Sequence, residues 1–520
     1  MLLAIILVPF AAAVVCAILP SGSSRAGRLS RFARPSRVAP AVTVVAGIAS
    51  LGLAMALVPS VVASGSVTEL TYLRADAISL VFLLATAFLY AALAVYCVGY
   101  LRHGHEDDDA YLRRFHVGFN LFAWAMLAAP LMSSLALLWI AVEITTIVSA
   151  LLVAIDDTSG AAEAAWKYVL IASAGLGLSL LATIFAYYAG SAVLGEHFDL
   201  AIQPMIAAGP KMAKTPVMLA FVLATLGYGT KTGLFPVHTW LPDAHSEAPT
   251  PVSALLSGAL LATSFYAILR FYQITAASLG SVFPRDVLLG FGVASLLLAA
   301  LYVFGQRDVK RLLAYSSVEH MGILAIGVSF GAPIALAGVF LHVLAHAAAK
   351  GNAFMGAGVL TVKYGTKQIG SIRGALRTLP WSGPLFLLAI FALSALPPSG
   401  IFRSEFEIVA GGLGSGSGAS AAGGGYALAA ILVVLVTLAF FGLSTSATQM
   451  LLARPARSLS AAAAHDPGGP GEPSRWMVVP VLAGMAVLVM LGLHPPGELT
   501  DLIARAVSQV TQATQPGGAR

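Results

Sequence analysis

Ionisable side chains recur at helical spacing inside segments of this sequence that are otherwise apolar. In LHVLAHAAAKGNAFMGAG, His342, His346 and Lys350 follow one another at intervals of four residues. On a helix this spacing puts the three side chains on one stripe, each about 6 Å along the axis from the next. Such a row can relay a proton, although one histidine on an apolar face is more often a satisfied core residue. No metal site is predicted, because the nearby sequence shows no third ligand of suitable type.

Glu143 and Lys231 form a second set. Glu143 lies near the middle of SSLALLWIAVEITTIVSALL, with no other charged residue within eleven positions on either side. Lys231 stands five residues before Pro236, which removes a backbone donor and interrupts the helix beside the amine. A desolvated lysine gives up its proton more easily than one in water, so Lys231 is a candidate proton carrier. The alternative is structural: Glu143 only pairs with a buried cation and holds helices together.

A third group follows a double proline in FALSALPPSGIFRSEFEIV. Glu407 falls toward a helix end that water can solvate, so Glu405 is the better candidate. Glu319 and His320 also lie inside an apolar segment. Because each such residue costs at least about 3 kcal/mol when it faces lipid, we expect them to face the bundle interior or a hydrated path.

The composition predicts an all-α polytopic membrane protein. Hydrophobic residues make up 58% of the 520 residues and charged residues only 10%, which excludes a water-soluble globular fold. Apolar stretches of about 20 residues recur along the chain, each long enough as a helix to cross a bilayer. The first stretch has no basic residues before it and no small-residue cleavage site, so we expect a transmembrane helix there and no cleaved signal peptide.

Proline, glycine and charge clusters divide the chain into fourteen predicted transmembrane helices. They lie near residues 1–20, 39–60, 76–100, 116–130, 132–155, 163–190, 216–236, 250–273, 286–305, 313–331, 334–362, 381–409, 424–452 and 476–494. On this count, nineteen of the 29 lysines and arginines share the side of the arginine-rich first loop, and seven fall on the other side. Since basic residues mark cytoplasmic loops, both termini are predicted outside the cytoplasm.

Two sets of five helices are predicted to form an inverted repeat. Comparing helices four to eight with nine to thirteen puts a proline-broken helix fourth in each set, and the odd number of helices reverses the second set. The chain then divides into three N-terminal helices (1–112), a first repeat (113–280), a second repeat (281–455), and a polar loop with the last helix and a short tail (456–520). Coincidence is the alternative, because proline is frequent in membrane helices.

Four polar residues fall in the loop that reconnects the first broken helix to helix eight at the cytoplasmic side: His238, Asp243, His245 and Glu247. They could form a hydrated route by which protons enter. Alternatively, they cap helices and bond the loop backbone.

No redox cofactor is predicted in this chain. Its two cysteines, Cys16 and Cys97, lie in different apolar segments, which excludes a CxxC pair or four-thiolate iron–sulfur ligation within the chain. Glycine and serine cluster at 411–425, where a flexible loop is expected in preference to a phosphate-binding one. The net charge of +6 reflects membrane orientation and does not indicate nucleic-acid binding.

The segments KTGLFPVHTWLPDAHSEAPTPVSALLSG, QRDVKRLLAYSSVEHMG, WIAVE and YLRADAISLVFLL resemble the antiporter-like, proton-pumping subunits shared by respiratory complex I, multisubunit sodium/proton antiporters and group 4 membrane-bound hydrogenases. SSVEHMG and FRSEF are most similar to the large membrane subunit of hydrogenase-4 and formate hydrogenlyase complexes. The resemblance implies fourteen core helices in two inverted repeats. It also implies that Glu143 and Lys231 form a coupled ion pair, that Lys350 is the central relay lysine, and that Glu405 is the terminal group.

The sequence departs from this family on helix eight. Many relatives carry a lysine or histidine where this chain has Ser257 and Ala262, so a relay from Lys231 to Lys350 needs water or another side chain. The leading hypothesis is a proton-translocating subunit of a redox-driven complex in the inner (plasma) membrane, with other membrane subunits and a peripheral redox arm as partners. The alternatives are a sodium/proton antiporter component without redox chemistry and a scaffold that only resembles the pump.

Overall fold

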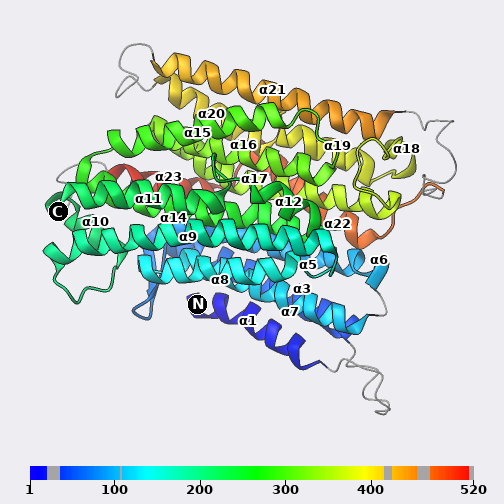
Figure 1. Cartoon of the computed structure of the whole chain (residues 1–520), viewed down its shortest axis with the longest axis horizontal. Coiled ribbons are helices and arrows are strands. Elements are labelled where there is room, and N and C mark those ends of the chain that lie inside the picture. Colours follow the sequence, from blue (N-terminus) through cyan, green and yellow to red (C-terminus); the bar gives the residue numbers. More distant parts are fainter. Residues whose placement is uncertain (20–34, 106–107, 415–423, 454–468, 514–520) are drawn as a thin grey trace.

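The computed structural model describes residues 1–19, 35–105, 108–414, 424–453 and 469–513, most of which are helical. The helices run side by side along the longest axis of the molecule, with α1 at one flank and α21 at the other (Figure 1). In chain order the elements are α1 (Leu2–Ile18), α3 (Pro35–Ala56), α4 (Val58–Ser64), β1 (Ser66–Glu69), β2 (Leu73–Asp76), α5 (Ala77–Tyr100), α6 (Arg102–His105), α7 (Asp109–Ala128), η1 (Ala129–Leu131), α8 (Leu135–Val153), α9 (Ser159–Leu194), α10 (Ile202–Ala208), η2 (Gly209–Lys211), α11 (Lys214–Thr232), α12 (Trp240–Glu247), α13 (Thr250–Leu255), η3 (Leu256–Leu260), α14 (Leu261–Leu279), α15 (Val282–Tyr302), α16 (Val309–Phe330), α17 (Pro333–Tyr364), α18 (Ala375–Thr378), α19 (Ser382–Leu393), α20 (Gly400–Gly414), α21 (Gly424–Leu452), α22 (Arg475–Leu493) and α23 (Gly497–Gln512).

The predicted all-α, multi-pass membrane fold is confirmed. Within the described residues, ten helical segments are long and apolar enough to cross a membrane: α3–α4, α5, α8, α9, α13–α14, α15, α16, α17, α21 and α22. The other four predicted spans coincide with α1, α7, α11 and the pair α19–α20, which are too short, too polar or interrupted to meet the same criteria. The count of fourteen therefore stays a prediction. The arginines between residues 20 and 34 and most of the glycine–serine cluster lie outside the described residues.

Four elements differ from the predicted fold. Strands β1 and β2 form a short antiparallel hairpin, with Ser66 opposite Asp76, ahead of α5. The segment predicted as a loop after the first broken helix contains a helix, α12, because its proline at position 242 falls in the first helical turn, where proline is tolerated. The tail predicted after the last span forms α23, which buries Leu502, Ala506 and Val510 on one face.

The two predicted helix breaks are present. Helix α11 ends because Gly233 adopts a left-handed conformation with φ of 84°, and Pro236 follows. Helices α19 and α20 are separated by the double proline, and the peptide bonds preceding Pro236 and Pro398 are both cis. In Figure 1, α11 and α20 lie toward one end of the long axis, whereas α12 and α19 lie toward the other. The chain thus passes the two breaks in opposite directions, which agrees with an inverted repeat; the domain boundaries stay predictions.

A buried ion pair joins the N-terminus of α5 to α14. Asp76 caps α5 by accepting a hydrogen bond from the Ser79 N–H, and it pairs with Arg270 at 2.6 Å. The guanidinium also lies 4.8 Å from the ring centroid of Tyr266. Because both charges are desolvated and pair with each other, removing either one would leave the other unpaired in the bundle. The pair therefore fixes the middle of α14 against the start of α5.

Helices α9 and α11 pack closely through glycine, and this contact positions Lys231. A methyl group added at Gly227 would lie 2.6 Å from the Gly175 carbonyl oxygen and 2.6 Å from the Ser179 nitrogen. Both neighbours belong to the backbone, so neither can move without shifting α9. We therefore infer that glycine at position 227 sets the distance between the two helices.

Gly227→Ala should lower the free energy of unfolding by about 1–3 kcal/mol, because the added methyl overpacks the α9–α11 contact. Thermal unfolding in detergent would measure the change. The matched control is Gly177→Ala on α9, where an added methyl meets no described atom within 4 Å. Equal melting temperatures for the two variants would contradict the close-packing argument.

Candidate functional site

Lys231 is fully buried at the end of α11, and its ammonium is held by one turn of α8. It donates to the Val142 carbonyl oxygen at 3.0 Å, to Thr145 Oγ1 at 2.7 Å and to Thr146 Oγ1. The ammonium also lies 6.0 Å from the ring centroid of Tyr168 on α9. Neutral oxygens thus solvate the amine in place of water, which lets a charged lysine exist at this depth.

Glu143 follows Val142 directly on α8, so its carboxylate belongs to the turn that binds Lys231. One carboxylate oxygen, Oε2, is buried and has no hydrogen-bond partner among the described residues. The described residues show no direct ion pair between Glu143 and Lys231. The structure therefore brings the predicted pair onto neighbouring turns without joining them, and their coupling stays a prediction.

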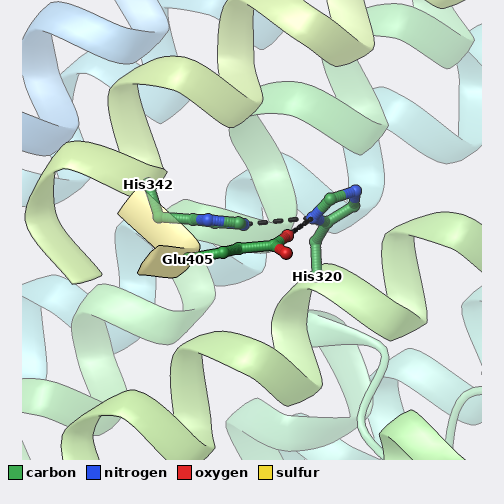
Figure 2. A group of neighbouring side chains, drawn as sticks. All are labelled: His320, His342 and Glu405. Carbon is green, nitrogen blue, oxygen red and sulfur yellow. Dashed lines mark hydrogen bonds and ion pairs between the residues drawn. The ribbon is translucent and has the colours of Figure 1, made fainter. Parts of the chain in front are cut away.

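A second cluster gathers ionisable side chains from three helices (Figure 2). His320 Nδ1 on α16 lies 3.1 Å from His342 Nε2 on α17 and 3.9 Å from Glu405 Oε1 on α20. The ring of His346 lies 5.1 Å from that of His320, centroid to centroid. All three histidines are fully buried, and Glu405 is 8% exposed. Three of the predicted residues, His342, His346 and Glu405, thus lie close to His320, whereas the place of Lys350 in a relay stays a prediction.

Hydrogen bonding determines the protonation pattern of His342. The Ser404 hydroxyl donates to the Ile401 carbonyl oxygen at 2.8 Å, so its oxygen accepts a hydrogen bond from His342 Nδ1–H at 2.9 Å. His342 Nε2 then carries the lone pair, and it accepts from His320 Nδ1–H. The two imidazoles form a directed hydrogen-bond chain from His320 through His342 to Ser404. Glu405 Oε1 lies beside this chain, 3.9 Å from His320 Nδ1, without a hydrogen-bond partner among the described residues.

Hydroxyl groups link Lys350 to the eighth predicted span, which consists of α13, η3 and α14. Its ammonium donates to the Leu313 carbonyl oxygen at 2.9 Å, and Ser317 Oγ donates to the same oxygen at 3.0 Å. Ser317 Oγ in turn lies 2.7 Å from Ser257 Oγ. Ser257 falls in η3, a π-helical turn between α13 and α14; such turns occur frequently at functional sites.

His245 lies between the surroundings of Lys231 and those of Lys350. Its ring is 6.5 Å from that of Trp240 and 5.5 Å from that of Phe354, centroid to centroid. Trp240 Nε1–H donates to the carbonyl oxygen of the residue before Lys231 at 2.7 Å, and Phe354 lies one turn beyond Lys350. Both ring nitrogens of His245 are buried without a partner among the described residues. A buried imidazole without a hydrogen-bond partner therefore lies between the two lysines, where Ser257 and Ala262 replace the lysine or histidine that many relatives carry.

The other residues predicted near the cytoplasmic end have different surroundings. Asp243 pairs with Arg311 at 2.6 Å and with Lys167 at 3.5 Å, and Glu247 pairs with Lys367 at 2.8 Å. These ion pairs connect α12 to α9, to α16 and to the loop after α17, so both carboxylates brace α12. This structural role differs from the helix capping and loop-backbone bonding considered as the alternative; whether the two carboxylates also admit protons stays a prediction.

His238 is largely buried in the turn before α12. Its ring lies 6.2 Å from that of Phe235 and 6.5 Å from that of Tyr315, centroid to centroid. Burial lowers the pKa of this imidazole below its usual range, so it is neutral near pH 7. A proton path through His238 consequently needs a transient charge on a ring that packs against aromatic side chains.

Sequence reasoning missed several members of these clusters. His320 was recognisable only as an ionisable residue in an apolar span, because nothing in SSVEHMG shows that it meets α17 and α20. The expectation that no third metal ligand lies nearby is wrong: ligand atoms of His320, His342 and Glu405 all lie within 4.8 Å of one another. Thr145, Thr146 and Ser404 carry no sequence signal that separates them from ordinary helix residues.

Comparison with known proteins shows the family to which the chain belongs. The family described as NADH:quinone oxidoreductase/Mrp antiporter, TM, matches residues 132–424, which contain both clusters. The chain belongs to this family. A hydrogenase-4 component F homolog from Methylacidiphilum infernorum is 31% identical over 83% of this chain and 87% of its own length. NADH-quinone oxidoreductase subunit N from Desulforudis audaxviator is 30% identical over 81% of both chains.

Solved structures support the fold of this NADH:quinone oxidoreductase/Mrp antiporter family member. A chain of the membrane-bound sulfane sulfur reductase, an archaeal respiratory complex, superposes with a TM-score of 0.81 at 19% identity, covering 99% of this chain and 98% of that one. A chain of the Mrp complex from Dietzia sp. gives a TM-score of 0.80 at 20% identity, covering 98% and 97%. At these identities the likeness shows a shared architecture.

The free energy of unfolding of this family member should decrease as the pH is lowered below 6.5, because of His245. Burial, reinforced by the charges of Lys350 and Lys310, lowers the pKa of its imidazole to about 3, whereas an imidazole in the unfolded chain binds a proton near pH 6.5. Between these values the unfolded chain binds more protons, so the folded state loses stability as the pH falls. From pH 6.5 to pH 5 the loss attributable to this group is about 2 kcal/mol.

Thermal unfolding in detergent at pH 7.5 and pH 5 measures this effect. His245→Leu should shrink the difference between the two melting temperatures, while His197→Leu, at an exposed position, should leave it as in the unchanged protein. An identical pH dependence in the unchanged protein and in His245→Leu would show that His245 does not stay neutral in the folded state.

Proposed function

We propose that this chain is a proton-translocating membrane subunit of a redox-driven complex. The observation that carries the proposal is the continuity of buried protonatable groups, from Glu143 and Lys231 in the first repeat to Lys350 and Glu405 in the second. Ionisable groups at membrane depth are costly and typically mark proton paths. A purely structural pairing of Glu143 with a cation explains neither the unbonded His245 nor the imidazole chain.

The first step is the exchange of a proton at Lys231. Its ammonium now contacts three oxygens of the turn that includes Glu143. Approach of the Glu143 carboxylate favours the charged amine, and withdrawal favours the neutral amine, because an opposite charge nearby stabilises the ammonium. A conformational change in a partner protein that moves α8 relative to α11 would therefore load or unload Lys231.

The second step carries the proton between the repeats. The groups available between Lys231 and Lys350 are the imidazole of His245 and the hydroxyls of Ser257 and Ser317. In this proposal they take the place of the lysine or histidine that many relatives carry on the eighth predicted span. Hydroxyl groups can transfer a proton by donating one hydrogen while accepting another. Water completes the path where side chains do not touch. From Lys350 the proton passes along the imidazole cluster to Glu405.

The electron-transfer chemistry belongs to partner subunits in this proposal. Relatives of this chain include a hydrogenase-4 component and a subunit of an NADH-quinone oxidoreductase, both named for redox complexes. We infer that the partners are other membrane subunits and a peripheral redox arm, and that no cofactor is bound by this chain. We place the protein in the inner (plasma) membrane with both termini on the non-cytoplasmic side, the orientation that the distribution of basic residues favours.

A second candidate is a component of a cation/proton antiporter without redox chemistry. A probable K(+)/H(+) antiporter component from Rhizobium meliloti is 28% identical over 98% of this chain, although the alignment covers only 49% of that protein. Both functions use the same buried amines. They differ in the driving force, which is electron transfer in one case and a cation gradient in the other.

The test is proton uptake by liposomes that contain the purified complex. Lys231→Ala should reduce uptake driven by the electron donor to less than about one tenth, because the central amine cannot be replaced by a methyl group. Assembly and electron transfer should persist. The control is Lys214→Ala at the exposed start of the same helix, which should leave uptake unchanged.

Full proton uptake by the Lys231→Ala complex would eliminate this mechanism. Uptake that needs a sodium or potassium gradient and ignores the electron donor would instead establish the antiporter. A complex in which neither driving force moves protons, with or without Lys231, would indicate a scaffold.

A further inference from the structure

We propose that His320, His342 and Glu405 form a binding site for a Zn²⁺ ion within the bundle. The three side chains come from α16, α17 and α20 and point toward one another (Figure 2). One ligand atom of each lies within 4.8 Å of the others, and all three residues are buried. Two imidazoles and one carboxylate are a common set of protein ligands for Zn²⁺, and imidazole disfavours Mg²⁺ and Ca²⁺.

The two distances from His320 lie near those of tetrahedral coordination, and the third, between His342 and Glu405, is at most 4.8 Å. With bonds of about 2.0–2.2 Å, two ligand atoms of a tetrahedral zinc site lie about 3.3–3.6 Å apart. His320 Nδ1 lies 3.1 Å from His342 Nε2 and 3.9 Å from Glu405 Oε1. Side-chain shifts of about 1 Å therefore convert the present arrangement into one face of a zinc tetrahedron.

The residues around His342 hold it in the tautomer that a metal needs. His342 Nδ1–H donates to Ser404 Oγ, so Nε2 presents its lone pair to the centre of the cluster. Metal-binding histidines typically make such a hydrogen bond through the other ring nitrogen. His320 becomes a ligand when its proton moves from Nδ1 to Nε2, which changes the tautomer without releasing a proton.

A further imidazole and a cavity lie beside the three ligands. Both ring nitrogens of His346 are buried without a partner among the described residues, and its ring lies 5.1 Å from that of His320. Glu405 lines a cavity of about 420 Å³ between the second helix break and α21, which Ser394 and Thr437 also line. An ion that enters this cavity meets the carboxylate first.

Bound Zn²⁺ would occupy the lone pairs through which the imidazoles exchange protons. If the proposed function is correct, the ion blocks the path between Lys350 and Glu405. Binding itself does not depend on that function, so the two are tested separately.

Calorimetric titration of the purified full-length chain with Zn²⁺ in detergent measures binding directly. We expect one tight site per chain. Glu405→Gln, which is nearly isosteric, and His342→Ala should each weaken it by at least about 100-fold. Ser404→Ala keeps all three ligands but frees the His342 tautomer, and it should weaken binding by about 10–100-fold. The control is His116→Gln on α7, a fully buried histidine bonded to Thr43, which should bind as tightly as the unchanged chain.

Tight binding that survives in Glu405→Gln and in Ser404→Ala would overturn the proposal, as would the absence of a tight site in the unchanged, folded chain. In liposomes, Zn²⁺ at the concentration that fills the site should stop proton uptake by the unchanged complex. Tight binding with undiminished uptake would leave the site in place and contradict the proposed path through the imidazoles.

Discussion

The burial of ammonium and imidazole groups where water is scarce is the constraint on which the site depends. Lipid offers no hydrogen bonds, so the protein must supply partners for every such group. Lys231 has three oxygens from one turn of α8. Lys350 binds a single carbonyl oxygen, that of Leu313, and both nitrogens of His346 and one oxygen of Glu405 have no partner among the described residues. Glu143 Oε2 and both nitrogens of His245 also lack partners among the described residues, so both repeats contain buried groups beside which mobile protons or water would be favoured.

The helix breaks serve this constraint. An unbroken helix uses its own carbonyl oxygens, whereas a break frees them for other donors. After α11 ends, the carbonyl oxygen of Thr230 accepts a hydrogen bond from the Trp240 indole at 2.7 Å, which draws α12 against the turn that carries Lys231. The second break places Ser404 and Glu405 in the first turns of α20, facing α17. In both repeats the interruption brings a new polar group to the depth of the buried amine.

Much of the fold could be predicted from the sequence, because apolar length and helix breakers act locally. The predicted span 424–452 coincides with α21, and 76–100 differs from α5 by one residue. The stripe of His342, His346 and Lys350 follows directly from helical periodicity. By contrast, the meeting of His320 with Glu405 depends on how far α16, α17 and α20 slide past one another, and no local pattern encodes that register. For the same reason the role of Thr145 could not be predicted. A threonine within a helix is common, and only the tertiary structure shows that Lys231 of another helix donates to its hydroxyl.

The ion pairs of α12 connect the two repeats at the molecular surface. Helix α12 directly follows the break beside Lys231, yet its Ser246 hydroxyl donates to Asp308 at 2.9 Å, and Asp308 is the N-cap of α16. One turn further along, α16 presents the Leu313 carbonyl oxygen that binds Lys350. A displacement of α12 caused by charging or discharging the first amine would therefore tilt the segment that solvates the second. The two amines can sense each other through the backbone, over a connection that operates whether or not a proton travels between them.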